Sequence, residues 1–338
     1  MHASGASGVK RIPAMIGLLG MAAMCGMAAS GDTLVFPGGK GPGSGKHIVL
    51  IAGDQEYRSE ESMPALAKML AERHGFTCTV LFSTNRQTGA IDPATMDNIP
   101  GLEALRTADL MIEFLRWLEL PDEQMKEIVD YAQSGRPMIS LRTGTHPFNY
   151  KLHPERQYAK YSWNSKDPAG GFGRLIIGET WVRHWGAHQK QSTRGVTAPG
   201  MQNEPILKGV KDVWGPSDVY EITTLSGDSR PLLMGQVLNG MTPDAQPDAS
   251  KRMMPIAWTK TYTGSSGKAA RVFGTTMGHA GDFENEGFRR LVVNACYWAV
   301  GREKKISATR DVSLAGTYKP NEIGLNKQKK DLKISDWR

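Results

Sequence analysis

The chain has 338 residues, of which 40% are hydrophobic, and a formal net charge of +7. This length and apolar content provide a core for one large domain or two small ones. The only basic run, 327–330, lies near the end of the chain, and no basic stripe is interleaved with aromatic residues. The composition therefore argues against a nucleic-acid partner.

Residues 1–30 have the pattern of a secretory signal peptide. Two basic residues precede an apolar run over 12–27, and small residues at 28–30 suit cleavage. The apolar run is shorter than the ~20 residues that a membrane span needs. We expect an exported protein, periplasmic or extracellular, that has no membrane segment after cleavage. An uncleaved anchor and a lipoprotein modified at Cys25 are the alternatives.

Alternating apolar runs and amphipathic segments follow a Gly-, Pro- and Ser-rich stretch, 31–46, which we expect to be a linker. The run 47–53 is continuously apolar and stopped by glycine, which is typical of a strand buried on both faces of a parallel sheet. Further strands are predicted at 76–82, 109–114, 137–141, 218–225, 231–237, 255–258 and 271–276, and helices at 62–74, 102–107, 121–134 and 288–300. This alternation predicts a doubly wound α/β fold.

Two stretches lack such periodicity. Residues 149–205 are rich in Trp, Tyr, His and Gly, and a loop-rich insertion of this length is often a lid or wall of a functional site. Residues 303–338 are polar and predict a surface tail. Cys78 and Cys296 lie among apolar neighbours, which favours buried free thiols over a disulfide, although sequence alone leaves both open.

Four polar clusters directly follow predicted strands, and the carboxyl ends of parallel strands form the edge where ligands bind. The first cluster holds Asp54, Arg58 and Glu61. A guanidinium beside carboxylates can bind a polar ligand. The alternative is a helix N-terminus capped by Ser59 with local ion pairs.

The second cluster is Arg142-Thr143-Gly144-Thr145-His146. It occupies the strand-to-helix turn at which α/β hydrolases and class I amidotransferases carry a nucleophile. The turn has neither cysteine nor Gly-x-Ser-x-Gly, so acyl transfer lacks its usual attacking group. His146 can act as a general acid or base, and Arg142 or Arg58 can steady a developing oxyanion. The alternative is a structural histidine that fixes the turn.

The third cluster runs from Glu179 to His188. His184 and His188 are four residues apart, a spacing that chelates a metal when the stretch is helical, with Glu179 as a further ligand. There is no His-Glu-x-x-His motif, and Gly186 weakens a helix. Trp181 and Trp185 also suit stacking on a sugar ring, or simply an aromatic patch.

The fourth cluster centres on His279, which follows a strand that ends in glycine. Asp282 or Glu284 could orient its ring, and Trp258 and Thr259 on the neighbouring strand could form a wall of the site. The alternative is a loop histidine bonded to the backbone.

These residues resemble the ThuA-like (trehalose utilisation) family, which shares the class I glutamine amidotransferase-like fold. The resemblance covers residues 47–302. Its segments are 47–61, 135–148, 178–188, 230–241 and 255–301, and the last contains Ala257-Trp258-Thr259, Gly278-His279, Phe288-Arg289-Arg290-Leu291 and Trp298-Ala299. Arg142 lies near the point where many relatives have a histidine, so that role would pass to His146.

The resemblance implies a mostly parallel, flavodoxin-like sheet and a role in carbohydrate metabolism, with a sugar or keto-sugar as ligand and no amidotransferase activity. We expect an enzyme that isomerises, cleaves or hydrolyses a glycoside or keto-sugar. The alternatives are a non-catalytic sugar-binding module and a metal-dependent hydrolase. No cofactor is predicted beyond a possible divalent metal, and the small carbohydrate is the expected partner, with a homo-oligomer left open. The candidate catalytic residues are His146, His279, His184, His188 and Arg142, and the candidate substrate-binding residues are Asp54, Arg58, Glu61, Thr143, Trp181, Trp185, Trp258, Thr259 and Glu284.

Overall fold

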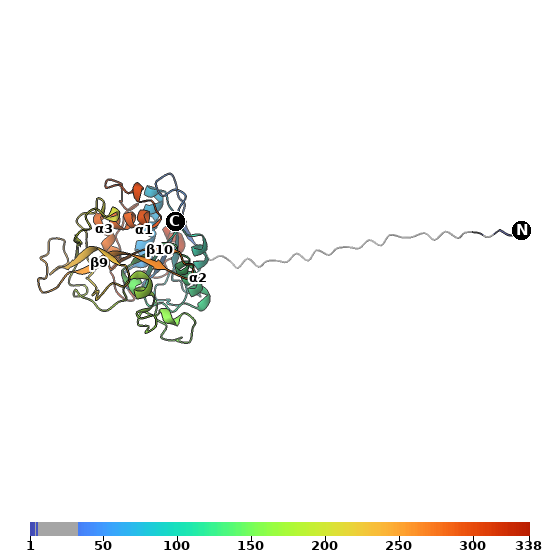
Figure 1. Ribbon diagram of the computed structural model, residues 1–338, viewed down its shortest axis with the longest axis horizontal. Helices are drawn as coiled ribbons and strands as arrows, with labels where there is room; N and C mark the ends of the chain where they lie inside the picture. The colour runs from blue at the N-terminus through green and yellow to red at the C-terminus, as the bar shows by residue number, and fades with distance from the viewer. Residues whose placement is uncertain (4, 6–32) are drawn as a thin grey trace. The chain divides into compact units, whose positions relative to one another are not determined.

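The computed structural model describes residues 1–3, 5 and 33–338 of the chain. The chain divides into two units, 1–30 and 31–338, and the second carries the fold described below (Figure 1). Nearly all of the predicted signal peptide lies outside the described residues, so the structure does not test it. Among the described residues, no helix is both long and apolar enough to cross a bilayer.

One sheet organises the described part of the chain. Its strand order is β1-β3-β2-β4-β5-β10-β9-β8-β6-β7. The strands are β1 Leu34–Phe36, β2 His47–Gly53, β3 Thr77–Phe82, β4 Leu110–Leu115, β5 Met138–Leu141, β6 Thr193–Thr197, β7 Trp214–Gly215, β8 Arg230–Val237, β9 Met254–Thr263 and β10 Ala269–Thr275.

The two halves of the sheet differ in strand direction. Strands β3, β2, β4, β5 and β10 pair in parallel. The strands β9, β8, β6 and β7 extend this half with antiparallel pairs, and β1 adds an antiparallel edge. The expectation of an α/β fold is confirmed, but the sheet is mixed, and only one half is parallel. The reason is local: the short loop 264–268 between β9 and β10 allows a hairpin, whereas a parallel pair needs a dozen or more connecting residues.

Helices cover both faces of the parallel half. The α-helices are α1 Ser59–His74, α2 Asp122–Gln133 and α3 Glu286–Ala299, and the short helical turns are η1 Leu102–Thr107, η2 Arg142–Thr145, η3 Ala159–Tyr161, η4 Gly173–Ile177, η5 Pro205–Leu207, η6 Ala280–Glu284, η7 Glu303–Lys305 and η8 Ile334–Trp337. Along β2, Ile48 and Leu50 join the core that contains α1 and α3, whereas Val49 and Ile51 join the core that contains η1 and α2. Successive side chains of a strand point to opposite faces, so a continuous apolar run serves two cores.

Three stretches differ from expectation. The predicted linker 31–46 includes β1, which pairs with β3. The predicted strand 218–225 does not form; its one ladder contact is an isolated bridge between His184 and Tyr220. The stretch 149–205 is largely irregular, as expected, but it contains β6. Cys78 and Cys296 are buried and free.

Candidate functional site

The loops that follow β2, β4, β5 and β10 meet at one edge of the sheet because these strands run in parallel. After β2 the chain forms β3 on one side and then returns to form β4 on the other. Ligand sites of open α/β sheets lie at such a reversal, outside the carboxyl ends of the strands. The polar residues described next come from these four loops and from two irregular segments, 181–188 and 217–220.

Arg142 is at the centre of the site. Its φ is +47°, an uncommon backbone conformation for a non-glycine residue, and its side chain is fully buried. Nη1 donates to the carbonyl oxygens of Asp218 (2.6 Å) and Thr276 (2.9 Å), and Nη2 donates to Asp218 Oδ1 (2.8 Å). The guanidinium lies between the rings of Tyr57 (4.6 Å) and Tyr220 (3.9 Å). These internal contacts do not fit the predicted oxyanion-binding role; Arg142 positions other residues instead.

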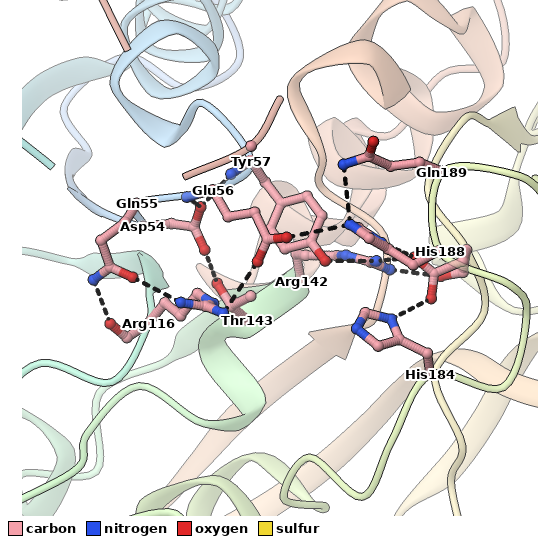
Figure 2. Close-up of polar contacts among 12 residues, drawn as sticks. Asp54, Gln55, Glu56, Tyr57, Arg116, Arg142, Thr143, His184, His188 and Gln189 are labelled. Atoms are coloured by element: carbon pink, nitrogen blue, oxygen red, sulfur yellow. Dashed lines mark hydrogen bonds and ion pairs between the residues drawn. The ribbon is translucent and has the colours of Figure 1, made fainter. Parts of the chain in front are cut away.

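Asp218 joins the arginine to two histidines. His184 Nδ1 lies 2.7 Å from Asp218 Oδ2, and His188 Nδ1 lies 3.0 Å from Asp218 Oδ1. Figure 2 shows Arg142 with the side chains of His184 and His188. Burial raises the pKa of Asp218, but the Arg142 guanidinium and the two imidazoles outweigh burial and hold the pKa well below its usual range. Hydrogen bonds to Asp218 and Glu56 raise the pKa of His188 to about 9.

A second line of contacts runs through the loop after β2. His188 Nε2 lies 3.2 Å from Glu56 Oε1, and Arg116 Nη2 lies 3.1 Å from Glu56 Oε2. Buried Asp54 accepts a hydrogen bond from Thr143 Oγ1 (2.7 Å) and another from the backbone N–H of Glu56 (2.8 Å). Asp54 and Thr143 therefore tie the loop after β2 to the turn after β5, and burial raises the pKa of Asp54.

His146 lies in an aromatic wall. Its ring centroid is 5.4 Å from that of Trp117 and 5.7 Å from that of Trp181, and Trp163 contacts both indoles. Nδ1 is 3.0 Å from Thr145 Oγ1. The side chain is buried, and burial lowers its pKa well below the ordinary value, so the imidazole is neutral near pH 7.

His279 lies on the other side of Arg142. Its Nδ1 accepts a hydrogen bond from the backbone N–H of Gly281 (2.7 Å), which leaves the proton of the neutral ring on Nε2. Burial lowers the pKa of His279 to about 3. Asp282 does not orient this ring as expected, because its carboxylate accepts from Ser217 and from the Gly278 N–H.

The four histidines surround one stack of side chains. His279 is next to Tyr57 (ring centroids 5.8 Å apart), and His146 is next to Tyr220 (6.1 Å), with Arg142 between the two tyrosines. His184 and His188 contact Tyr220 and Tyr57 respectively. Residues separated by more than a hundred positions thus form one cluster.

Several predicted site residues are elsewhere. Arg58 donates from Nη2 to the Gly324 carbonyl (2.8 Å), and Glu61 accepts from Asn321, so both bind the C-terminal segment. Glu284 is exposed at the end of η6.

The predicted tryptophan wall on β9 is also absent. Trp258 is fully buried and donates from Nε1 to the Ile177 carbonyl (2.8 Å), and Thr259 is in mid-strand opposite Phe273. Trp185 donates from Nε1 to the Arg252 carbonyl (2.9 Å), and it is Trp181 that contacts the histidines.

The predicted metal ligand Glu179 is buried, but it forms an ion pair with Arg174 and accepts from two backbone N–H groups. Asp218, and not Glu179, is the carboxylate that lies beside the two histidines. Potential ligand atoms of His184, His188 and Asp218 lie within 4.8 Å of one another. His184 and His188 are not in a helix, in line with the weakening effect expected of Gly186, and their side chains meet without helical spacing.

The sequence analysis did not identify seven residues of the site, which are Glu56, Tyr57, Arg116, Trp117, Trp163, Asp218 and Tyr220. Glu56 and Tyr57 lie in the polar run that directly follows β2, and this position after a strand is the signal that indicates them. Asp218 and Tyr220 carry no comparable signal, because they come from an irregular segment with no motif.

The fold and the cluster define a class: mixed α/β proteins with a polar, histidine-rich site at the carboxyl edge of their parallel strands. Residues 48–299 match the model of the ThuA family, described as trehalose utilisation. The chain belongs to this family.

Two solved structures are similar to the chain. A ThuA-like protein from Parabacteroides merdae ATCC 43184 is 16% identical, with 85% of this chain and 99% of that chain covered and a TM-score of 0.47. A ThuA-like protein from Bacteroides uniformis ATCC 8492 is 15% identical, with 80% and 96% covered and a TM-score of 0.47. No curated protein matches the chain.

Proposed function

We propose that the protein is an exported enzyme of carbohydrate metabolism that acts on a glycoside or keto-sugar by histidine acid–base chemistry. The observation that carries this proposal is His146, a buried neutral imidazole packed against both Trp117 and Trp181. Indole surfaces suit the apolar face of a sugar ring, and a neutral imidazole can accept a proton.

The two buried histidines have complementary roles in this proposal. Nε2 of His146 has no hydrogen-bond partner among residues 33–338, and it would take a proton from the carbon next to the carbonyl of a keto-sugar. His279 carries its proton on Nε2 and would donate a hydrogen bond to the sugar. A proton returned to the neighbouring carbon gives isomerisation, and loss of a leaving group gives elimination. Arg142 and Asp218 would keep the loops in place.

The same proposal covers the fold and the export. The parallel strands run in the order β3-β2-β4-β5-β10, with helices packed on both faces, which supports a doubly wound, flavodoxin-like half. The basic and apolar pattern of residues 1–30 supports export. The ThuA family, described as trehalose utilisation, supports a carbohydrate substrate.

A ligand and product screen tests the function. Purified protein is incubated with trehalose, other disaccharides and their 3-keto derivatives, while calorimetry records binding and chromatography records products. We expect saturable binding and turnover of at least one sugar. Binding without turnover would support a sugar-binding module instead. The absence of both binding and turnover for every sugar tested would overturn the proposal.

A further inference from the structure

We propose that His184, His188 and Asp218 form a binding site for a divalent transition-metal ion, with Zn²⁺ as the best match. This inference stands apart from the proposed sugar chemistry, because it concerns a ligand that can be measured without substrate. Two imidazoles and one carboxylate are a common zinc ligand set.

The ligand atoms already converge. His184 Nδ1 is 2.7 Å from Asp218 Oδ2, and His188 Nδ1 is 3.0 Å from Asp218 Oδ1. Zinc bonds of about 2.0–2.2 Å place neighbouring ligand atoms about 2.8–3.6 Å apart. Small side-chain rotations would therefore open the space for an ion between the three residues.

The contacts behind the ligands are a second and independent observation. A metal-bound histidine usually donates its other ring N–H to a carboxylate, which fixes the tautomer. With Nδ1 of His188 on the metal, its Nε2 would donate to Glu56 Oε1, 3.2 Å away, while Arg116 holds the other oxygen of Glu56. Asp218 is held from behind by Arg142 in the same way.

Exposure of the ligands shows which side of the site is open. The Asp218 side chain is 1% exposed, whereas those of His184 and His188 are 36% and 27% exposed. The carboxylate would anchor the ion on the inside, and the outer side would stay free for water or another ligand, as in catalytic zinc sites. Arg142 and Arg116 oppose the charge of an ion here, so we expect weaker binding than at a closed structural zinc site.

The test is a metal titration of the untagged protein after chelator treatment. We expect one Zn²⁺ per chain by calorimetry, and a visible absorption band on titration with Co²⁺. His184→Ala should lower the Zn²⁺ affinity at least tenfold, and Glu56→Gln should lower it about 10- to 100-fold, the range for residues behind a ligand. His153→Ala, an exposed histidine outside the cluster, is the matched control and should bind like the parent.

Circular dichroism establishes that each variant is folded. The His184 side chain is partly exposed, so His184→Ala should leave the fold intact, and the Zn²⁺ affinity of this variant decides the result. Failure of the stripped parent to bind Zn²⁺, or equal binding by the parent and by His184→Ala, would overturn the inference. Neither result depends on whether any sugar is bound or turned over.

Discussion

Arg142 holds Asp218 at two points, through a hydrogen bond from Nη1 to its carbonyl oxygen and an ion pair from Nη2 to its carboxylate. One guanidinium thereby fixes both the backbone and the side chain of a residue 76 positions away. Asp218 in turn orients His184 and His188. The Arg142–Asp218 pair is the contact on which the geometry of these two histidines depends.

Removal of the arginine should therefore destabilise the fold. Arg142→Met leaves the Asp218 carboxylate buried without its guanidinium, and breaking a buried pair in this way costs about 3–5 kcal/mol. Urea denaturation should show a loss of this size in the free energy of unfolding. Arg183→Met is the control, because Arg183 is an exposed partner of Glu221, and such pairs contribute about 0–1 kcal/mol. Equal losses in the two variants would contradict the central position of Arg142.

Two tryptophans of the same loop should differ in their effect on sugar binding. Trp181 contacts His146, whereas the Trp185 indole donates to the Arg252 carbonyl. Trp181→Ala should weaken sugar binding at least tenfold, which corresponds to about 1.4 kcal/mol, and Trp185→Ala should leave it nearly unchanged. Calorimetry with the best sugar of the screen measures both. A larger loss of sugar affinity in Trp185→Ala than in Trp181→Ala would show that the sugar does not bind beside His146.

Glu113 should make stability depend on pH. It is buried in β4 opposite Ser140, and burial raises its pKa from 4.5 to about 8. Between these pH values the unfolded chain releases a proton that the folded chain retains. The contribution of Glu113 to stability is therefore fully present below pH 4.5 and is lost as the pH rises to about 8, by up to about 1.4 kcal/mol per pH unit.

Glu113→Gln removes this titration. Denaturation curves between pH 4.5 and 8 should become flatter, and the variant should gain most over the parent at pH 8. Glu72→Gln, on the exposed side of α1, should follow the parent. An unchanged slope in Glu113→Gln would show that the carboxyl group is not buried as described.

The histidines should titrate at widely different pH. In the metal-free protein the pKa of His279 is lowered to about 3 by burial, and that of His146 is also lowered well below 6.5. Hydrogen bonds to two carboxylates raise that of His188 to about 9. NMR of the ring carbons, assigned by single substitutions, should show His146 and His279 neutral at pH 6 and His188 still protonated at pH 8. Titration of all three near 6.5 would contradict the burial and contacts described.

The sequence predicted what local patterns encode. The apolar run ending at Gly53 and the amphipathic helix 286–299 appear within a few residues of their expected bounds. The positions of His146 and His279 after strands were also sufficient to place them at one edge. The hairpin of β9 and β10 was not predicted, because the hydrophobic pattern indicates strands but not their relative direction. The antiparallel direction follows only from the short loop between the two strands.

The candidate site was only partly predictable, because its contacts join distant parts of the chain. Nothing in the segment around Asp218 indicates that its carboxylate meets Arg142 and two histidines. Arg58 had the right type and position after a strand, yet its guanidinium binds the carbonyl of Gly324 in the tail. The residue type and the position directly after a strand identify candidate site residues, but the packing of the whole chain decides which of them face the cluster.

The most direct measurement of the central claim is turnover of the best keto-sugar by His146→Gln, with its affinity measured beside it. Glutamine keeps a polar side chain in the Trp117–Trp181 wall but cannot accept the proton. The account predicts sugar affinity within a few-fold of the parent and a rate lower by about 10²–10⁴, the usual contribution of a general base. Parental turnover in this variant would contradict the account.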